Sequence, residues 1–125
     1  MIDHVGILVA DLARSKRLYT QGLVAIEFGF VMEHEISGAG FGPAGRPIFW
    51  IKQGEVHTRT HIAFRVDDKA TVDAFHAAFL RAGARDDGPP GFRPEYYDGY
   101  YGAFVRDLDG HSIEAVCHGA PRDQT

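Results

Sequence analysis

Two stretches of the chain, residues 2–10 and 59–66, alternate between apolar and polar positions as half-buried strands do. His4 and His61 stand at the same point of the two stretches. In each stretch three β-branched or aromatic residues share one parity, and the histidine has the other. Successive side chains of a strand point to opposite faces, so both histidines should face away from the core. The core-facing residues are then Val5, Ile7 and Val9 in the first stretch and Ile62, Phe64 and Val66 in the second.

An amphipathic segment follows each strand and predicts a helix. Asp11 and Asp68 stand where an N-cap carboxylate accepts from free backbone N–H groups, and Gly22 and Gly83 stand near the expected ends. Each helix should cover the apolar face of its own strand. The apolar stripes are Leu12, Leu18, Tyr19 and Leu23 in the first helix and Val72, Phe75, Ala78 and Phe79 in the second.

The rest of each half is expected to supply more strands. Residues 37–47 and 86–93 are rich in glycine and proline and predict loops, the first with at most a short strand. Strand-like segments are residues 24–32 and 48–53 in the first half and 102–106 and 111–118 in the second. Each half then consists of a strand, a helix and about three strands. This internal repeat predicts an α+β fold of two βαβββ modules, with mixed sheets curling around a central cavity.

A chain of 125 residues is one domain by length. We expect module 1 over about residues 1–57, module 2 over about residues 58–119, and a polar tail at residues 120–125. The connection between the modules is too short for a flexible linker, so the modules should pair around a shared surface.

Charge and cysteine content narrow the partners and the compartment. A net charge of -4 without a basic run argues against nucleic acid or an anionic membrane and favours a small molecule. Cys117 is the only cysteine, so no internal disulfide can form, which fits a reducing compartment. There is no N-terminal signal pattern and no apolar run near the roughly 20 residues that span a bilayer. We therefore expect a cytoplasmic protein.

Glu114 adds a carboxylate to the two histidines. Its strand places Ile113, Ala115 and Cys117 on a packed face, so Glu114 should look inward with His4 and His61. Two imidazoles and a carboxylate from three strands form a metal-ligand set with open positions for water or substrate. Taken singly, a strand histidine is more often hydrogen-bonded, and a terminal-strand glutamate is more often solvated. The repetition of the histidine in both halves favours the metal site.

These residues also resemble the vicinal oxygen chelate superfamily, which holds glyoxalase I, extradiol dioxygenases, fosfomycin-resistance transferases, methylmalonyl-CoA epimerase and the bleomycin-resistance proteins. The resemblance rests on residues 3–9, 60–64 and 101–116 and spans nearly the whole chain. It implies paired βαβββ modules and a homodimer whose sites form from both modules, sometimes across subunits. It also implies a divalent ion, iron, manganese, zinc or nickel, held by His4, His61 and Glu114, with Glu114 as the catalytic base.

Single activities of that superfamily match less well. Glyoxalase I would have a second glutamate where this chain has Phe49-Trp50-Ile51, and Gly6 replaces the threonine of the fosfomycin-resistance enzymes. Extradiol dioxygenases need a further histidine, for which the candidates are His57, His111 and His118, all three of which also fit surface or turn positions.

Arg65, Trp50 and Tyr101 are the expected substrate-binding residues. Arg65 shares the parity of His61 and could pair with an anionic substrate, although a salt bridge to an acidic neighbour explains it equally well. Trp50 and the tyrosines of residues 96–101 could line a pocket for a planar ligand, and core or dimer-interface packing is the alternative.

The sequence leaves three interpretations open. The first is a glyoxalase-like, metal-dependent enzyme of lyase, dioxygenase or transferase type, whose small oxygenated substrate chelates the metal through vicinal oxygens. The second is a metal-free protein that binds and sequesters a small molecule, as bleomycin-resistance proteins do. The third is a vestigial member whose histidines only form hydrogen bonds within the fold.

Overall fold

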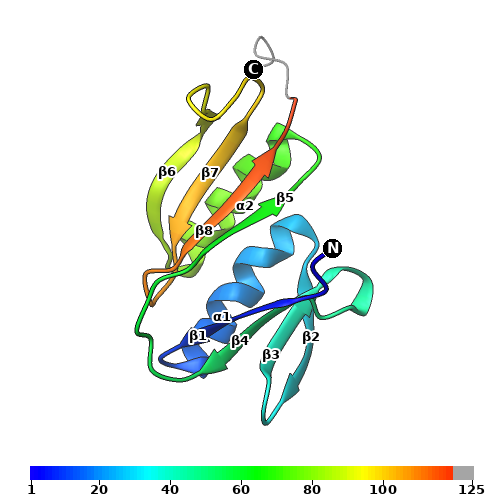
Figure 1. Ribbon diagram of the computed structural model, residues 1–125, viewed down its shortest axis with the longest axis vertical. Coiled ribbons are helices and arrows are strands. Elements are labelled where there is room, and N and C mark those ends of the chain that lie inside the picture. Colours follow the sequence, from blue (N-terminus) through cyan, green and yellow to red (C-terminus); the bar gives the residue numbers. More distant parts are fainter. Residues whose placement is uncertain (120–125) are drawn as a thin grey trace.

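The computed structural model describes residues 1–119, so the predicted tail lies outside the described residues. Both halves have the predicted βαβββ order (Figure 1), which confirms the α+β fold of two modules. Module 1 comprises β1 (Val5–Val9), α1 (Leu12–Leu23), β2 (Gly29–His34), β3 (Gly38–Gly42) and β4 (Phe49–Gln53). Module 2 comprises β5 (His61–Arg65), α2 (Lys69–Ala82), β6 (Arg85–Phe92), β7 (Tyr101–Arg106) and β8 (Ser112–Cys117).

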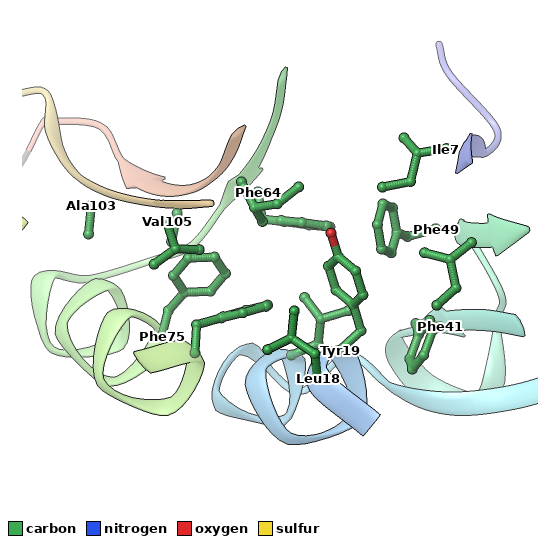
Figure 2. Packing of buried hydrophobic residues seen from close by; sticks show 14 of the residues in the cluster. Ile7, Leu18, Tyr19, Phe41, Phe49, Phe64, Phe75, Ala103 and Val105 are labelled. Atoms are coloured by element: carbon green, nitrogen blue, oxygen red, sulfur yellow. The ribbon is translucent and has the colours of Figure 1, made fainter. Parts of the chain in front are cut away.

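The two four-stranded sheets are mixed and open. Their strand orders are β1-β4-β3-β2 and β5-β8-β7-β6, with one parallel pair in each, β1 with β4 and β5 with β8. Both helices lie on the same side of the sheets, and the modules pack against each other through them (Figure 2). Each sheet therefore has one face covered by helices and one face that no helix covers. Neither sheet closes into a barrel.

One aromatic core joins the modules beneath the sheets. The Tyr19 ring from α1 lies 5.2 Å from Phe49 of module 1 and 5.8 Å from Phe79 of α2, measured between centroids. Phe49 in turn meets Phe64 of β5 at 5.5 Å (Figure 2). The predicted core faces of β1 and β5 are confirmed, because Ile7 and Phe64 are buried in this cluster.

The helix boundaries follow the predicted caps. Asp11 accepts from the backbone N–H of Arg14 at 3.1 Å, and Asp68 accepts from that of Thr71 at 2.8 Å. Hydrogen bonds from Thr71 lower the pKa of Asp68. Helix α2 ends at Gly83, whose φ of 116° is left-handed, as a C-cap glycine requires. None of the helices within residues 1–119 is long and apolar enough to cross a membrane.

One glycine- and proline-rich segment that predicts a loop is a strand, and the other contains the short strand that the sequence allows. Residues 86–92 of the predicted loop lie in β6, an edge strand with irregular register around Gly88, where prolines are tolerated because few ladder N–H groups are needed. Residues 38–42 form β3, where a Cβ at Gly38 would lie 1.9 Å from the carbonyl oxygen of Ile51. The glycines of β3 therefore serve close strand packing.

After α1, the sequence predicts a strand where the structure begins with a turn. The strand-like segment 24–32 begins with a 3-10 turn over Val24–Ile26, and Glu27 takes a left-handed conformation with a φ of 62°. Strand β2 starts only at Gly29. The apolar run alone did not reveal that the chain must reverse direction at this point to enter the sheet.

Candidate functional site

The parallel pairing of β5 with β8 brings two of the predicted site residues together. Ala63 lies opposite Glu114 in the ladder, and His61 lies opposite Ser112. The imidazole Nε2 of His61 is 3.0 Å from Oε1 of Glu114, with the His61 side chain 52% exposed and the Glu114 side chain 1% exposed. A buried carboxylate is thus paired with an imidazole that is half exposed to solvent.

Three neighbours fix the orientation of this pair. Nδ1 of His61 lies 2.9 Å from the Ser112 hydroxyl, and its ring stacks on Phe104 at 6.2 Å between centroids. The Tyr100 hydroxyl donates to Oε2 of Glu114. Burial, followed by the hydrogen bond and charge of Glu114, raises the pKa of Tyr100, so the phenol stays a donor. Both carboxylate oxygens therefore have a partner.

A glycine makes room for this arrangement. A Cβ at Gly102 would stand 3.1 Å from Oε2 of Glu114 and 3.1 Å from the Tyr100 ring. Glycine at this position of β7 lets the tyrosine fold over the sheet and reach the carboxylate.

His4 lies on the other module. It precedes β1, is 60% exposed at its side chain, and its Nδ1 is 2.7 Å from Asp3 Oδ1. With Gly6 and Trp50 it borders a cavity of about 520 Å³ on the open face of the module 1 sheet. His4 and His61 also border one groove of about 300 Å³ between the modules. Within residues 1–119, however, no three His, Cys, Asp or Glu side chains converge as a metal-binding group.

Arg65 and Tyr101 lie elsewhere. Arg65, four residues beyond His61 and so about 13 Å along the strand, lines a separate groove with Glu27 and Asp67. Tyr101 is buried on the helix side of β7 and donates to Asp73 at 2.7 Å, which places it in the core. The tyrosine that reaches Glu114 is Tyr100. The alternation of β7 contained this signal, because Tyr101 shares the parity of buried Ala103.

The other candidate histidines occupy structural or surface positions. His111 is 1% exposed, and its Nδ1 accepts from the Thr60 backbone N–H at 2.9 Å. His57 lies at the surface beside Glu55. His118 stacks on the Tyr97 ring at 5.3 Å between centroids.

A second cavity opens next to His61. Its volume is about 380 Å³, within the range of small-molecule sites. Its lining residues are His61, Asp87, Gly88, Arg93, Tyr96, Phe104 and Ser112. The site thus combines a buried carboxylate, an accessible imidazole, aromatic rings and a cation on one sheet face.

Paired βαβββ modules with two open, mixed sheets define a class of small α+β proteins to which this chain belongs. The sequence matches the model of the Glyoxalase/Bleomycin resistance protein/Dioxygenase superfamily over residues 1–115. The chain belongs to this superfamily, as the sequence resemblance indicated.

Solved structures agree with this assignment. A glyoxalase/bleomycin resistance protein from Albidiferax ferrireducens T118 is 28% identical, with a TM-score of 0.81 over 93% of this chain and 98% of that one. The fosfomycin resistance protein FosX from Mesorhizobium loti is 24% identical, with a TM-score of 0.68 over 94% and 91%. A lactoylglutathione lyase from Agrobacterium tumefaciens is 19% identical, with a TM-score of 0.69 over 94% and 92%. The last two show the shared fold alone. A comparison of the sequence with curated proteins finds no match.

Proposed function

We propose that the protein is a glyoxalase-like enzyme that uses a divalent metal ion at His61 and Glu114 to act on a small oxygenated molecule with vicinal oxygens. The observation that carries the proposal is the His61–Glu114 pair. A carboxylate that is 1% exposed and 3.0 Å from a half-exposed imidazole costs free energy to bury, and a structural role alone gives no reason for leaving the imidazole open to a cavity.

The donor atoms suit such an ion. Imidazole nitrogen and carboxylate oxygen are common ligands of iron, manganese, zinc and nickel. Ser112 at Nδ1 and Tyr100 at Oε2 provide the outer hydrogen bonds that orient metal ligands, and they leave Nε2 and Oε1 directed toward each other. His61 and Glu114 would therefore hold the ion from one chain.

A third ligand is proposed to come from His4 of a second copy. His4 is exposed on the open face of its own sheet and does not converge with Glu114 within the described chain. Two-fold pairing of two copies through their open sheet faces would place module 1 of one copy over module 2 of the other. The protein is therefore proposed to be a homodimer with two equivalent sites.

In the proposed reaction the residues of the site have separate roles. The bound ion would supply Lewis acidity for the vicinal oxygens of the substrate. Glu114 would accept a proton from the substrate carbon beside those oxygens through Oε1, released from the ion for that step, and the electron pair left on the carbon would pass to the adjacent oxygen as an enolate. Tyr100 donates to Oε2 and holds the carboxylate in place, while Phe104 and Tyr96 line the cavity beside it.

A metal-free binding protein is the second candidate, and one observation favours it. Both oxygens of Glu114 already have hydrogen-bonding partners, His61 and Tyr100, without any ion. Aromatic rings beside them, Tyr96 and Phe104, offer faces for a planar ligand. In this role His61 would donate from Nε2 to the carboxylate and contribute to the wall of the cavity.

Metal content separates the two candidates. Protein purified without an affinity tag and reconstituted with iron, manganese, zinc or nickel is expected to retain about one ion per site by elemental analysis. His61→Ala and Glu114→Gln should each abolish retention. His57→Ala is the matched control, because His57 is exposed and its ion-pair partner is Glu55, and it should bind as wild type does. Absence of retained metal from the wild-type protein would rule out the metalloenzyme and leave the binding protein.

Mixing two variants tests the shared site. In His4→Ala every site lacks the ligand from the second copy, and in His61→Ala every site lacks the ligand from its own copy. Subunit exchange between them creates heterodimers with one intact site, which restores about a quarter of the wild-type sites in a statistical mixture. No recovery on mixing, in a dimer shown by sedimentation to exchange, would place His4 outside the site.

A further inference from the structure

Arg93 is held in a fixed position over the cavity beside His61. Its Cζ lies 5.5 Å from the centroid of the Phe104 ring, and Nη2 donates to the Pro89 carbonyl at 2.7 Å. The same Phe104 ring stacks on His61 at 6.2 Å. A cation and the site imidazole thus lie against one aromatic ring and line one cavity of about 380 Å³.

Two glycines of β6 provide the space that the guanidinium occupies. A Cβ at Gly91 would stand 3.0 Å from Nη1 of Arg93, and a Cβ at Gly88 would stand 3.2 Å from Nη2. Gly88 also has a φ of +152°, which disfavours a side chain at that position. The irregular register of β6, which sequence patterning represents as a loop, therefore forms a cradle for one arginine side chain.

Charge at the cavity is arranged to leave this cation available. Asp87 also lines the cavity, but its carboxylate is paired with Nε of Arg106 at 2.9 Å. Among residues 1–119, no carboxylate forms an ion pair with Arg93. A half-buried guanidinium with one N–H on a carbonyl and one face on an aromatic ring still has donors in a planar fork, the geometry that matches an oxyanion.

We propose that Arg93 binds a carboxylate or phosphonate group of the ligand, so that the molecule held at His61 and Glu114 is an anion. This inference rests on the proposed function for the location of the ligand, although not for the presence of metal. Arg93 then selects the substrate class and orients the molecule, with its oxyanion on the guanidinium and its remaining oxygens toward His61. Arg65, which lines another groove, is not needed for this recognition.

Calorimetric titration of metal-free protein with benzoate, phenylphosphonate and neutral benzamide tests the proposal. The wild-type protein should bind at least one of the two anions saturably and bind benzamide more weakly. Arg93→Gln should weaken anion binding about ten-fold or more, the effect of losing a charge-assisted hydrogen-bonded pair. Arg85→Gln is the matched control, because it removes the same charge from an exposed position of β6 and should change the affinity less than about two-fold.

Gly91→Ala separates the cradle from the charge. The added methyl group displaces Nη1 without altering net charge, so anion affinity should fall several-fold while circular dichroism and the thermal midpoint stay near wild type. Equal anion affinity in wild type and Arg93→Gln, or no saturable binding of either anion, would overturn the inference. Metal retention tests the proposed enzyme separately. If the protein retains metal but its anion binding does not depend on Arg93, only this inference is wrong. If anion binding depends on Arg93 but no metal is retained, only the proposed metalloenzyme is wrong.

Discussion

The Tyr19 hydroxyl of module 1 donates a hydrogen bond of 2.5 Å to the Asp107 carboxylate of module 2. The other Asp107 oxygen accepts from the backbone N–H groups of Asp109 at 3.0 Å and His111 at 2.8 Å. His111 continues the connection, because its Nε2 lies 2.8 Å from the Leu8 carbonyl of β1. These contacts set how the two sheets sit relative to each other, and thus where His4 and His61 lie.

Tyr19→Phe should weaken the joint between the modules. It removes a donor from a carboxylate that is 6% exposed, and an unsatisfied buried acceptor costs about 1–3 kcal/mol. Urea denaturation should show a drop of this size in the free energy of unfolding. Tyr96→Phe is the control, since Tyr96 is exposed, and it should stay within about 0.5 kcal/mol of wild type. Equal losses in the two variants would show that the Tyr19–Asp107 bond adds nothing to stability.

Stability should also fall at alkaline pH. Burial, and then the charge and hydrogen bond of Asp107, raise the pKa of Tyr19, while burial and the hydrogen bond to Asp73 raise the pKa of Tyr101 to about 12. An unfolded tyrosine titrates near pKa 10. The folded state therefore favours the neutral phenols, so their contribution is complete below about pH 10 and is lost as the pH rises toward the folded pKa values.

Chemical denaturation at a series of pH values from 9 upward measures this loss. Tyr19→Phe should show a shallower decline than wild type, because it lacks one of the responsible groups. A decline that is unchanged in Tyr19→Phe would assign the alkaline sensitivity to other residues.

Gly22→Ala should disrupt the packing of the two helices. A Cβ at Gly22 would fall 2.6 Å from ring atoms of Phe79, which is 0% exposed and has no space to withdraw into. Overpacking of this kind costs about 1–3 kcal/mol and should lower the thermal midpoint. Gly29→Ala is the control, because nothing lies within 4 Å of a Cβ there. A variant at Gly22 as stable as the one at Gly29 would mean that the helices can move apart freely.

The sequence was sufficient to predict the two modules and which face of their first strands is buried. The β-branched and aromatic residues of 5–9 and 62–66 recur at every second position, and an aspartate caps each helix, so local patterns predict these elements correctly. The strand in residues 86–92 and the close contacts of the β3 glycines could not be found in this way. Gly38 is required by the backbone of Ile51, a residue of another strand, and no local pattern reveals so close an approach.

The same distinction applies to the site residues, because some follow from local patterns and others do not. The pairing of His61 with Glu114 follows from strand alternation plus the order of strands within one module, both of which repeat in the chain. Strand parity separates Tyr100 from Tyr101, but the contact of Tyr100 with Glu114 also needs the space above Gly102, which strand parity does not show. The position of Arg93 could not be predicted, because it depends on the glycines of an edge strand that the sequence pattern represents as a loop. The role proposed for His4 depends on a second copy, which the pattern of one chain does not specify.

Tyr100→Phe should make the stability of the protein more dependent on metal. Without the hydroxyl, Oε2 of Glu114 stays buried without its donor, so the metal-free variant should lose about 1–3 kcal/mol of unfolding free energy. Metal retention should persist, because Nε2 of His61 and Oε1 of Glu114 are unchanged. Ligand that binds only the folded state adds stability by mass action, so added metal should recover much of the loss.

Tyr97→Phe is the control for this comparison, because the Tyr97 hydroxyl contacts His118 and not Glu114. Thermal denaturation with and without the metal that the wild-type protein retains measures both variants. Glu114→Gln should gain nothing from metal, since it keeps the side-chain shape but loses the anionic ligand. If metal stabilised Glu114→Gln as much as it stabilised Tyr100→Phe, the ion would be binding outside the His61–Glu114 pair.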